Sequence, residues 1–212
     1  MKDYEALSRK HFDAQAAQYD ARDTMYYSRE GKISCRDIAS RLKDVSYASL
    51  LDVGCGTGFL IDLLTRQHPA QYTGLDLSPE MIRMAKLKQI HGAEFVIGSA
   101  DSLPFPDAAF DIVTCSQSFH HYPYQEKAMS EVLRVLKPGG LYILSDTGVG
   151  GIGAWIDNQI LFRISRSGDC RTTNRKGIAR MMEQTGFQVV ECCQLQGFIY
   201  TVTGKKGESA HV

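Results

Sequence analysis

Three glycines spaced by single residues, Gly54, Gly56 and Gly58, follow the aliphatic stretch Ser49–Val53 and precede a helical pattern. Glycine lets the backbone turn sharply and leaves no Cβ between the peptide and a ligand. At a turn from strand to helix, such glycines lie where α/β proteins bind nucleotides, at the carboxyl end of a strand. The spacing alone also fits a tight turn that binds nothing.

Two carboxylates strengthen the interpretation of this turn as a binding site. Asp52 lies at the end of the first predicted strand, and Asp76 lies at the end of the next. A carboxylate in the second position can accept two hydrogen bonds from a ribose diol. We expect Ser78 to cap the helix that follows, which leaves Asp76 for a ligand. The pattern predicts a nucleoside-containing cofactor. Phe59 stands where a dinucleotide fingerprint needs glycine, so an NAD-dependent oxidoreductase is a weaker alternative.

The elements that position these residues alternate between strand and helix patterns. The predicted strands are Ser49–Val53, Gln71–Asp76, Ala93–Ile97, Phe110–Cys115, Leu141–Ser145, Phe187–Cys193 and Gly197–Thr203. Alternation of this kind predicts an α/β fold with a doubly wound, mostly parallel, seven-stranded Rossmann-like sheet. The final two strands are close enough in sequence to form a hairpin, with the last strand antiparallel. Residues 1–48 lack a strand pattern and predict helices beside the sheet.

Five motifs in order resemble class I S-adenosylmethionine-dependent methyltransferases, in particular the small-molecule branch that includes ubiquinone/menaquinone-type enzymes. The resemblance covers Phe12–Leu144. The motifs are Phe12-Asp13 with Ala16–Asp20, Leu51–Gly58, Gly74–Met81, Gly98–Phe105 with Phe110-Asp111, and Arg134–Gly140. It implies three regions within one structural domain: a helical segment at 1–48 that covers the site, an S-adenosylmethionine-binding α/β domain at 49–204, and a flexible tail at 205–212.

The resemblance also implies a role for each motif. Asp52 would hold the ammonium group of the cofactor, Asp76 the ribose, and Leu77 and Met81 the adenine. Many relatives carry an acid at the position of Ser99, whereas here the acid is displaced to Asp101. The implied cofactor-binding residues are Tyr19, Asp52, Gly54, Cys55, Gly56, Gly58, Asp76, Leu77, Met81, Ser99, Ala100, Asp101 and Ser116.

The acceptor side gives weaker signals. His120 and His121 follow the fourth predicted strand, and either can act as a general base if the acceptor must lose a proton. A histidine that only packs or caps in this loop is an equal alternative. No cluster of ligands in the sequence suggests a metal site. The predicted helix Ala154–Ile164 could form an apolar lid after a flexible Gly148–Gly153.

Composition narrows the class of partner. Lys and Arg total 24, as do Asp and Glu, so no net charge favours nucleic acid. The polar N-terminus, the absence of a long apolar run, and six cysteines without a C-x-x-C pair predict a cytoplasmic protein. The prediction is a methyltransferase for a small-molecule acceptor. A cofactor-binding protein without catalysis and an RNA or protein methyltransferase remain alternatives, and neither the acceptor nor the oligomeric state is indicated.

Overall fold

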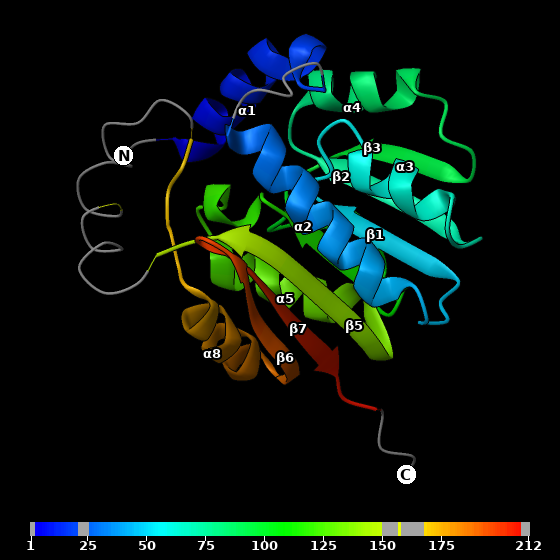
Figure 1. The fold of residues 1–212 in the computed structure, drawn as a ribbon, viewed down its shortest axis with the longest axis vertical. Coiled ribbons are helices and arrows are strands. Elements are labelled where there is room, and N and C mark those ends of the chain that lie inside the picture. Colours follow the sequence, from blue (N-terminus) through cyan, green and yellow to red (C-terminus); the bar gives the residue numbers. More distant parts are fainter. Residues whose placement is uncertain (1–2, 21–25, 150–156, 158–167, 209–212) are drawn as a thin grey trace.

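The computed structural model describes residues 3–20, 26–149, 157 and 168–208 (Figure 1). Its centre is one seven-stranded sheet in the order β3-β2-β1-β4-β5-β7-β6. All neighbouring pairs from β3 to β5 are parallel, and β7 runs antiparallel to both β5 and β6. The predicted fold class is therefore confirmed. The strands are β1 Ser49–Val53, β2 Gln71–Asp76, β3 Ala93–Ile97, β4 Phe110–Ser116, β5 Leu136–Thr147, β6 Phe187–Gln196 and β7 Ile199–Lys206.

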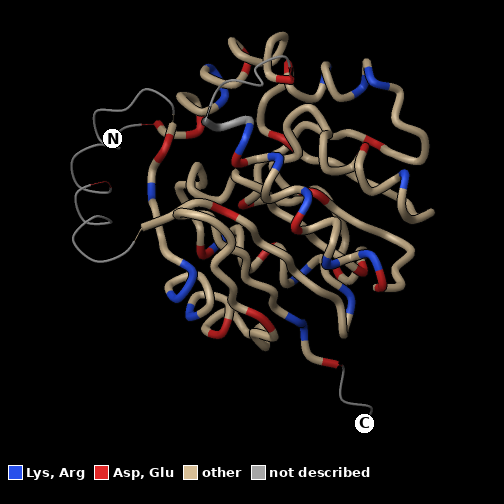
Figure 2. Tube along the Cα trace, viewed as in Figure 1, with Lys and Arg blue, Asp and Glu red and all other residues tan. Residues whose placement is uncertain are grey.

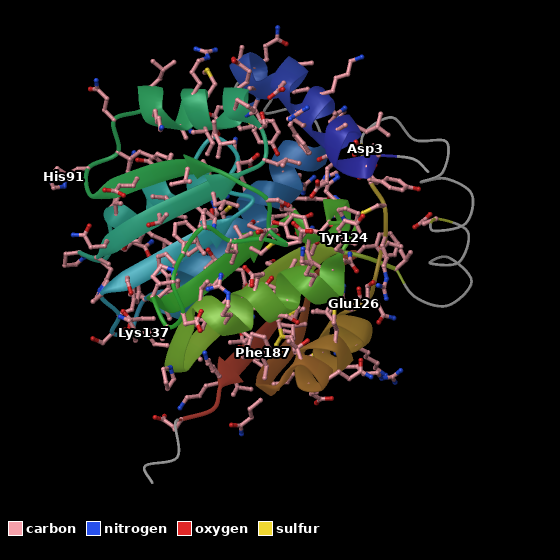
Figure 3. The ribbon with its side chains drawn as sticks, turned by 180° about the vertical axis from the view of Figure 1, so that it is seen from behind. Asp3, His91, Tyr124, Glu126, Lys137 and Phe187 are labelled. Atoms are coloured by element: carbon pink, nitrogen blue, oxygen red, sulfur yellow. The ribbon has the colours of Figure 1, made fainter. Side chains whose placement is uncertain are left out.

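Helices cover both faces of this sheet. The described helices are α1 Tyr4–Gln15, η1 Ala16–Gln18, α2 Tyr26–Leu42, α3 Phe59–Thr65, α4 Pro79–Leu87, η2 Phe119–His121, α5 Gln125–Val135 and α8 Arg175–Thr185. α2, α3 and α4 pack on one face, and α5 and α8 pack on the other (Figures 1 and 3). Tyr124 and Glu126 mark the beginning of α5, with Lys137 just beyond its opposite end (Figure 3).

The period-two alternation of the strands explains why two separate cores form. In β1, Leu50 packs with the α2–α3 side while Leu51 packs with the α5–α8 side. Ile112 and Val113 of β4 divide in the same way. The central strands β1 and β4 are therefore buried on both faces, as expected in the middle of a parallel sheet between two layers of helices. The edge strands β3 and β6 are more exposed.

Several predicted strand boundaries were wrong, and β4, β5, β6 and β7 all end later than predicted. β5 begins at Leu136 rather than Leu141, because Leu136 already pairs with Phe110 beside an irregularity in the ladder. β7 continues to Lys206 rather than ending at Thr203. The Lys206 ammonium donates to the carbonyl oxygens of Leu133 (2.8 Å) and Leu136 (2.7 Å), which fastens the strand to the C-terminal end of α5. The first residues of the predicted tail are therefore part of the sheet.

The structure describes some of the other segments predicted from the sequence and leaves others outside the described residues. Helices do occupy the N-terminal region, with α1 and α2 beside the sheet. The predicted lid helix at Ala154–Ile164 lies outside the described residues, apart from Asp157. Lys and Arg alternate with Asp and Glu over the described trace, and neither sign gathers on one region in this view (Figure 2). Among the helices of the described part, none combines the length and apolarity that crossing a membrane requires.

Candidate functional site

A cavity of about 320 Å³ opens beyond the carboxyl ends of β1, β2 and β4, and residues of α1 form part of its lining. The strand order reverses between β1 and β4, which is where doubly wound sheets bind ligands. Its size falls in the range of small-molecule sites. Of the residues predicted from the sequence to contact a cofactor, twelve line this cavity: Tyr19, Asp52, Gly54, Cys55, Gly56, Asp76, Leu77, Met81, Ser99, Ala100, Asp101 and Ser116.

The Gly-rich turn brings bare backbone to the cavity wall. Gly54, Gly56 and Gly58 all have positive φ, at 75°, 53° and 79°. A Cβ on Gly54 would lie 2.0 Å from the hydroxyl oxygen of Ser118, so no other residue fits there without rearrangement. The amide of Gly54 donates to the carbonyl of Leu75 at the end of β2 (2.7 Å), which ties the turn to the second strand.

Asp52 offers a buried negative charge at the end of β1. Its side chain is 2% exposed and accepts a hydrogen bond from the Thr114 hydroxyl at 2.8 Å. Burial raises the pKa of Asp52 to about 7, and the nearby Asp76 carboxylate adds to the rise, while the Thr114 bond opposes it. A buried carboxylate whose hydrogen-bond partner is neutral favours a cationic ligand. The site therefore fits the ammonium group of an amino acid such as the methionine portion of S-adenosylmethionine.

Asp76 is positioned by the backbone on both sides. One carboxylate oxygen accepts from the Gly56 amide at 2.8 Å, and the other accepts from the Ser78 amide at 2.9 Å. Ser78 caps α4 as predicted, with its hydroxyl accepting from the Met81 amide at 3.1 Å. A carboxylate has about four acceptor positions, so two remain for a ribose diol. Burial raises the pKa of Asp76, and these backbone hydrogen bonds oppose that rise.

A second pair of carboxylates flanks Ser99 at the far end of the cavity. The Ser99 hydroxyl lies 2.7 Å from an Asp101 oxygen and 2.8 Å from an oxygen of Glu5 on α1. One hydroxyl hydrogen can serve only one of these acceptors at a time. Asp101 also pairs with Lys127 at 3.3 Å. Glu5 therefore supplies an acid beside Ser99 from another part of the chain, close to where the resemblance expects one.

The segment after α1 is fastened to the Gly-rich turn. Asp20 accepts from the Thr57 hydroxyl at 2.7 Å and pairs with the Lys88 ammonium at 2.7 Å. Tyr19 lines the cavity, where burial and the Asp76 carboxylate raise the pKa of Tyr19 to about 12. The Phe12 ring packs edge-on against Tyr19, with 6.3 Å between centroids. The N-terminal helical segment thus forms one wall of the cavity.

The two histidines differ in environment although they are adjacent in η2. His120 Nδ1 lies 2.7 Å from an oxygen of Asp146, a residue that is 1% exposed. Burial lowers the pKa of His120, but the carboxylates of Asp146 and Asp169 outweigh it, so the net effect is a raised pKa. Burial and the neighbouring His120 lower the pKa of His121 to about 3. His121 lines the cavity and packs edge-on against Phe12 at 5.0 Å.

Two predicted site residues lie outside the cavity lining. Gly58 is at the N-terminal end of α3, where a Cβ would lie 2.9 Å from the ring of Phe95, so close packing accounts for this glycine. His120 lies behind His121, beside Asp146. The sequence prediction missed Glu5, Asp20 and Ser118. Glu5 lies on the N-terminal helix and belongs to no sequence motif. Asp20 lies within the motif Ala16–Asp20 but was not predicted as a site residue.

Comparison with known proteins agrees with this geometry. Residues 51–144 match the model of the methyltransferase domain. Over 115 residues the chain is 42% identical to the phthiotriol/phenolphthiotriol dimycocerosates methyltransferase of Mycobacterium leprae (strain TN), covering 53% of this chain and 43% of that protein. Over 105 residues it is 45% identical to the fatty-acid O-methyltransferase of Mycolicibacterium smegmatis, covering 49% and 38%. The chain thus covers less than half the length of these curated relatives.

Solved structures share the fold at low sequence identity. A putative methyltransferase in complex with the Haloferax volcanii Trm112 methyltransferase activator superposes with a TM-score of 0.78 at 19% identity, covering 97% of this chain and 100% of that one. The [4+2]-cyclase SpnF superposes with a TM-score of 0.78 at 17% identity, covering 98% of each chain. Fold similarity alone therefore includes proteins named for different chemistry.

The fold is shared with solved methyltransferase structures, and residues 51–144, less than half of the chain, are similar to the methyltransferase domain family.

Proposed function

We propose that the protein transfers a methyl group from S-adenosylmethionine to a small molecule. The observation that carries this proposal is the placement of Asp52, Asp76 and the Gly54–Gly56 backbone around one cavity. Asp52 would hold the ammonium group, and Asp76 would hold the ribose hydroxyls. Bound there, the sulfonium supplies an activated methyl group. The protein then contributes orientation and exclusion of water.

The acceptor is proposed to be an apolar molecule with a polar group at the reacting end. Two of the similar proteins are named for lipid-like acceptors, a fatty acid and a dimycocerosate. Phe12 lies between Tyr19 on the donor side and His121 on the other, so its ring lines the passage where the two substrates would meet. His120 and His121 remain candidate bases for an acceptor that loses a proton.

The proposed location is the cytoplasm. All six cysteines are in the described part of the chain, and all are free thiols, three of them buried. Unpaired cysteines are typical of a reducing compartment.

Net charge is zero, which supports a small molecule rather than a nucleic acid as the partner.

Calorimetric titration of the full chain with S-adenosylmethionine, S-adenosylhomocysteine and NAD tests the cofactor. We expect both adenosyl ligands to bind and NAD not to bind. Asp76→Ala should lose at least tenfold in affinity, because the ribose diol loses its acceptor. Binding of NAD instead, or of none of the three, would contradict the proposal.

A methyl-release assay tests catalysis separately. Formation of S-adenosylhomocysteine is measured with a panel of fatty acids, long-chain alcohols and phenols. Turnover of one class identifies the acceptor. Tight cofactor binding with no turnover on any member would favour the alternative of a cofactor-binding protein without methyl transfer.

A further inference from the structure

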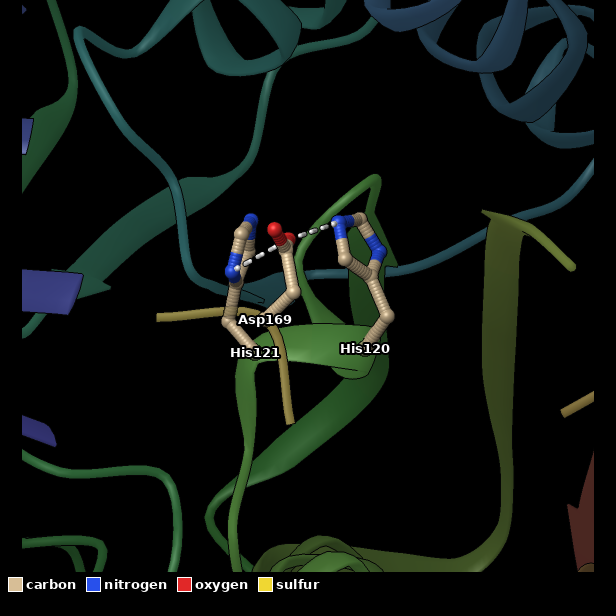
Figure 4. Close-up of side chains that lie close together, drawn as sticks. All are labelled: His120, His121 and Asp169. Carbon is tan, nitrogen blue, oxygen red and sulfur yellow. Dashed lines mark ion pairs between the residues drawn. The ribbon is translucent and has the colours of Figure 1, made fainter. Parts of the chain in front are cut away.

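We propose that His120, His121 and Asp169 bind a divalent transition-metal ion at the acceptor end of the cavity. The two histidines come from η2, and Asp169 comes from the segment that precedes α8 (Figure 4). One ligand atom from each residue lies within 4.8 Å of the others. The sequence pattern does not predict this cluster of three residues, because Asp169 is far along the chain from the histidines.

The first argument is the orientation of His120. Its Nδ1 lies 2.7 Å from Asp146, whose other oxygen accepts from the His120 amide at 3.0 Å. Asp146 is held further by the Thr147 amide at 2.7 Å. A carboxylate acceptor requires the hydrogen on Nδ1, so in the neutral imidazole the lone pair is on Nε2, which faces Asp169 at 3.7 Å. A carboxylate behind a histidine is the usual outer-shell support of a metal-ligating imidazole.

The second argument is an unsatisfied atom. His121 Nδ1 is buried and makes no hydrogen bond among the described residues. It lies 3.3 Å from the same Asp169 oxygen that faces His120. Buried polar atoms without a partner are rare in folded proteins and call for an explanation. A cation between the imidazole and the carboxylate would satisfy this nitrogen.

The third argument is distance and charge. Metal bonds of about 2.1 Å place neighbouring ligand atoms roughly 3.0 to 3.4 Å apart in octahedral or tetrahedral geometry. The distances of 3.3 and 3.7 Å from Asp169 need only small adjustments. The carboxylates of Asp146, Asp169 and Glu30 act electrostatically on His120, and His11 of α1 acts on His121. The two histidines are thus surrounded by three carboxylates and one further imidazole, and the excess of negative groups favours a bound cation.

The ligand set indicates which ion. Two imidazoles and one carboxylate suit Zn²⁺, Fe²⁺ or Co²⁺ rather than Mg²⁺ or Ca²⁺, which prefer oxygen ligands. Three protein ligands leave at least one coordination position open, and His121 places the site at the cavity wall. Resting on the proposed function, we infer that an oxygen of the acceptor completes the coordination. An imidazole that ligates the ion through its free nitrogen cannot also serve as the general base.

Titration of the full chain with Co²⁺ alone tests the site without cofactor or acceptor. We expect one equivalent to bind, with a visible spectrum of nitrogen and oxygen ligands. Asp169→Asn should weaken binding at least tenfold, and Asp146→Asn should weaken it by about tenfold through the loss of outer-shell support. The matched control is Asp44→Asn, an exposed carboxylate outside the cluster, which should bind Co²⁺ as the wild type does.

Three results would overturn the proposal: no binding, equal affinity in Asp169→Asn and Asp44→Asn, or a thiolate charge-transfer band that assigns the ion to cysteines. Titration of each variant with S-adenosylmethionine gives a separate measurement. Wild-type cofactor affinity with lost Co²⁺ binding assigns the defect to the metal site. A wild type that binds Co²⁺ but not the cofactor would refute the proposed function and leave the metal site in place.

Discussion

The end of the cavity proposed to bind the methyl donor (the donor end) and the end proposed to bind the acceptor (the acceptor end) are formed by different parts of the chain. At the donor end, main-chain atoms of the Gly54–Gly56 turn and carboxylates at strand ends are fixed by the register of β1 against β2. At the acceptor end, side chains from η2 meet Asp169 from a segment outside the sheet. The donor end is therefore set by the fold, while the acceptor end is set by contacts between distant segments.

This difference explains which residues are similar to the methyltransferase domain family. The match covers residues 51–144, which include the turn, Asp76 and both histidines, but it omits α1 and Asp169. A conserved cofactor can share one backbone-built site across many proteins, since main-chain geometry tolerates sequence change. Recognition of different acceptors must come from the parts that vary, and loops and termini vary most readily.

The largest expected effect comes from filling the donor turn. Gly54→Ala would place a Cβ 2.0 Å from the Ser118 hydroxyl oxygen, so the turn or its neighbour must move. We expect cofactor affinity to fall by at least 100-fold in calorimetry, with a lower melting temperature. Gly197→Ala is the control, because Gly197 also has positive φ but a Cβ added there would have nothing within 4 Å. Similar losses in both variants would show that φ strain, and not the steric contact, is responsible.

The acceptor end should respond to Asp146→Asn with a different signature. The substitution weakens the contact that orients His120 without touching the donor turn. We expect turnover to fall about 10- to 100-fold, while S-adenosylmethionine affinity stays within about twofold. A parallel fall in cofactor affinity would mean that the two ends are not independent.

Cofactor binding should depend on pH through Asp52. The folded protein without ligand holds this carboxyl at a pKa of about 7, so it is neutral below that pH and cannot attract an ammonium group. Affinity should rise as the pH increases, by about tenfold from pH 6 to pH 8. Asp52→Asn keeps an oxygen for the Thr114 hydroxyl but should bind weakly and show a flat profile. A wild-type profile that is equally flat would disprove this role.

The smallest expected effect concerns Glu5 and the adenine. If the Glu5 carboxylate accepts a hydrogen bond from the adenine amino group beside Ser99, Glu5→Gln should weaken S-adenosylhomocysteine binding about threefold. It should change binding of S-inosylhomocysteine, which lacks that amino group, much less. Exposed Glu94→Gln serves as the control for loss of one negative charge. Equal changes for both ligands would show that Glu5 acts only through its charge.

The sequence predicted the sheet and the position of the Gly-rich turn within it, because local patterns encode both. Alternating strands and helices fix the sheet, and glycines with carboxylates at strand ends mark the edge where a ligand binds. Ser78 was correctly predicted as a helix cap because a cap depends only on the residues that follow it. Strand ends were less accurate. At the end of β7, Lys206 pairs with Phe187 of β6 and its ammonium bonds to the carbonyl oxygens of Leu133 in α5 and Leu136 in β5, contacts that no local pattern predicts.

The acceptor end was harder to predict for the same physical reason. His120 and His121 were identified as candidates, but their difference depends on Asp146 and Asp169, which approach only in the folded chain. Glu5 reaches Ser99 from α1, and no spacing rule connects them. The roles of the individual site residues remain predictions for the experiments above.

The attachment of Asp20 to Thr57 and Lys88 also has a kinetic consequence. It joins the N-terminal wall to the rim of the donor turn through one ion pair and one hydrogen bond, with Asp20 partly exposed to solvent. If spent cofactor leaves past this wall, these two contacts must break first. Salt screens a partly exposed ion pair. The rate of cofactor release should therefore increase with ionic strength.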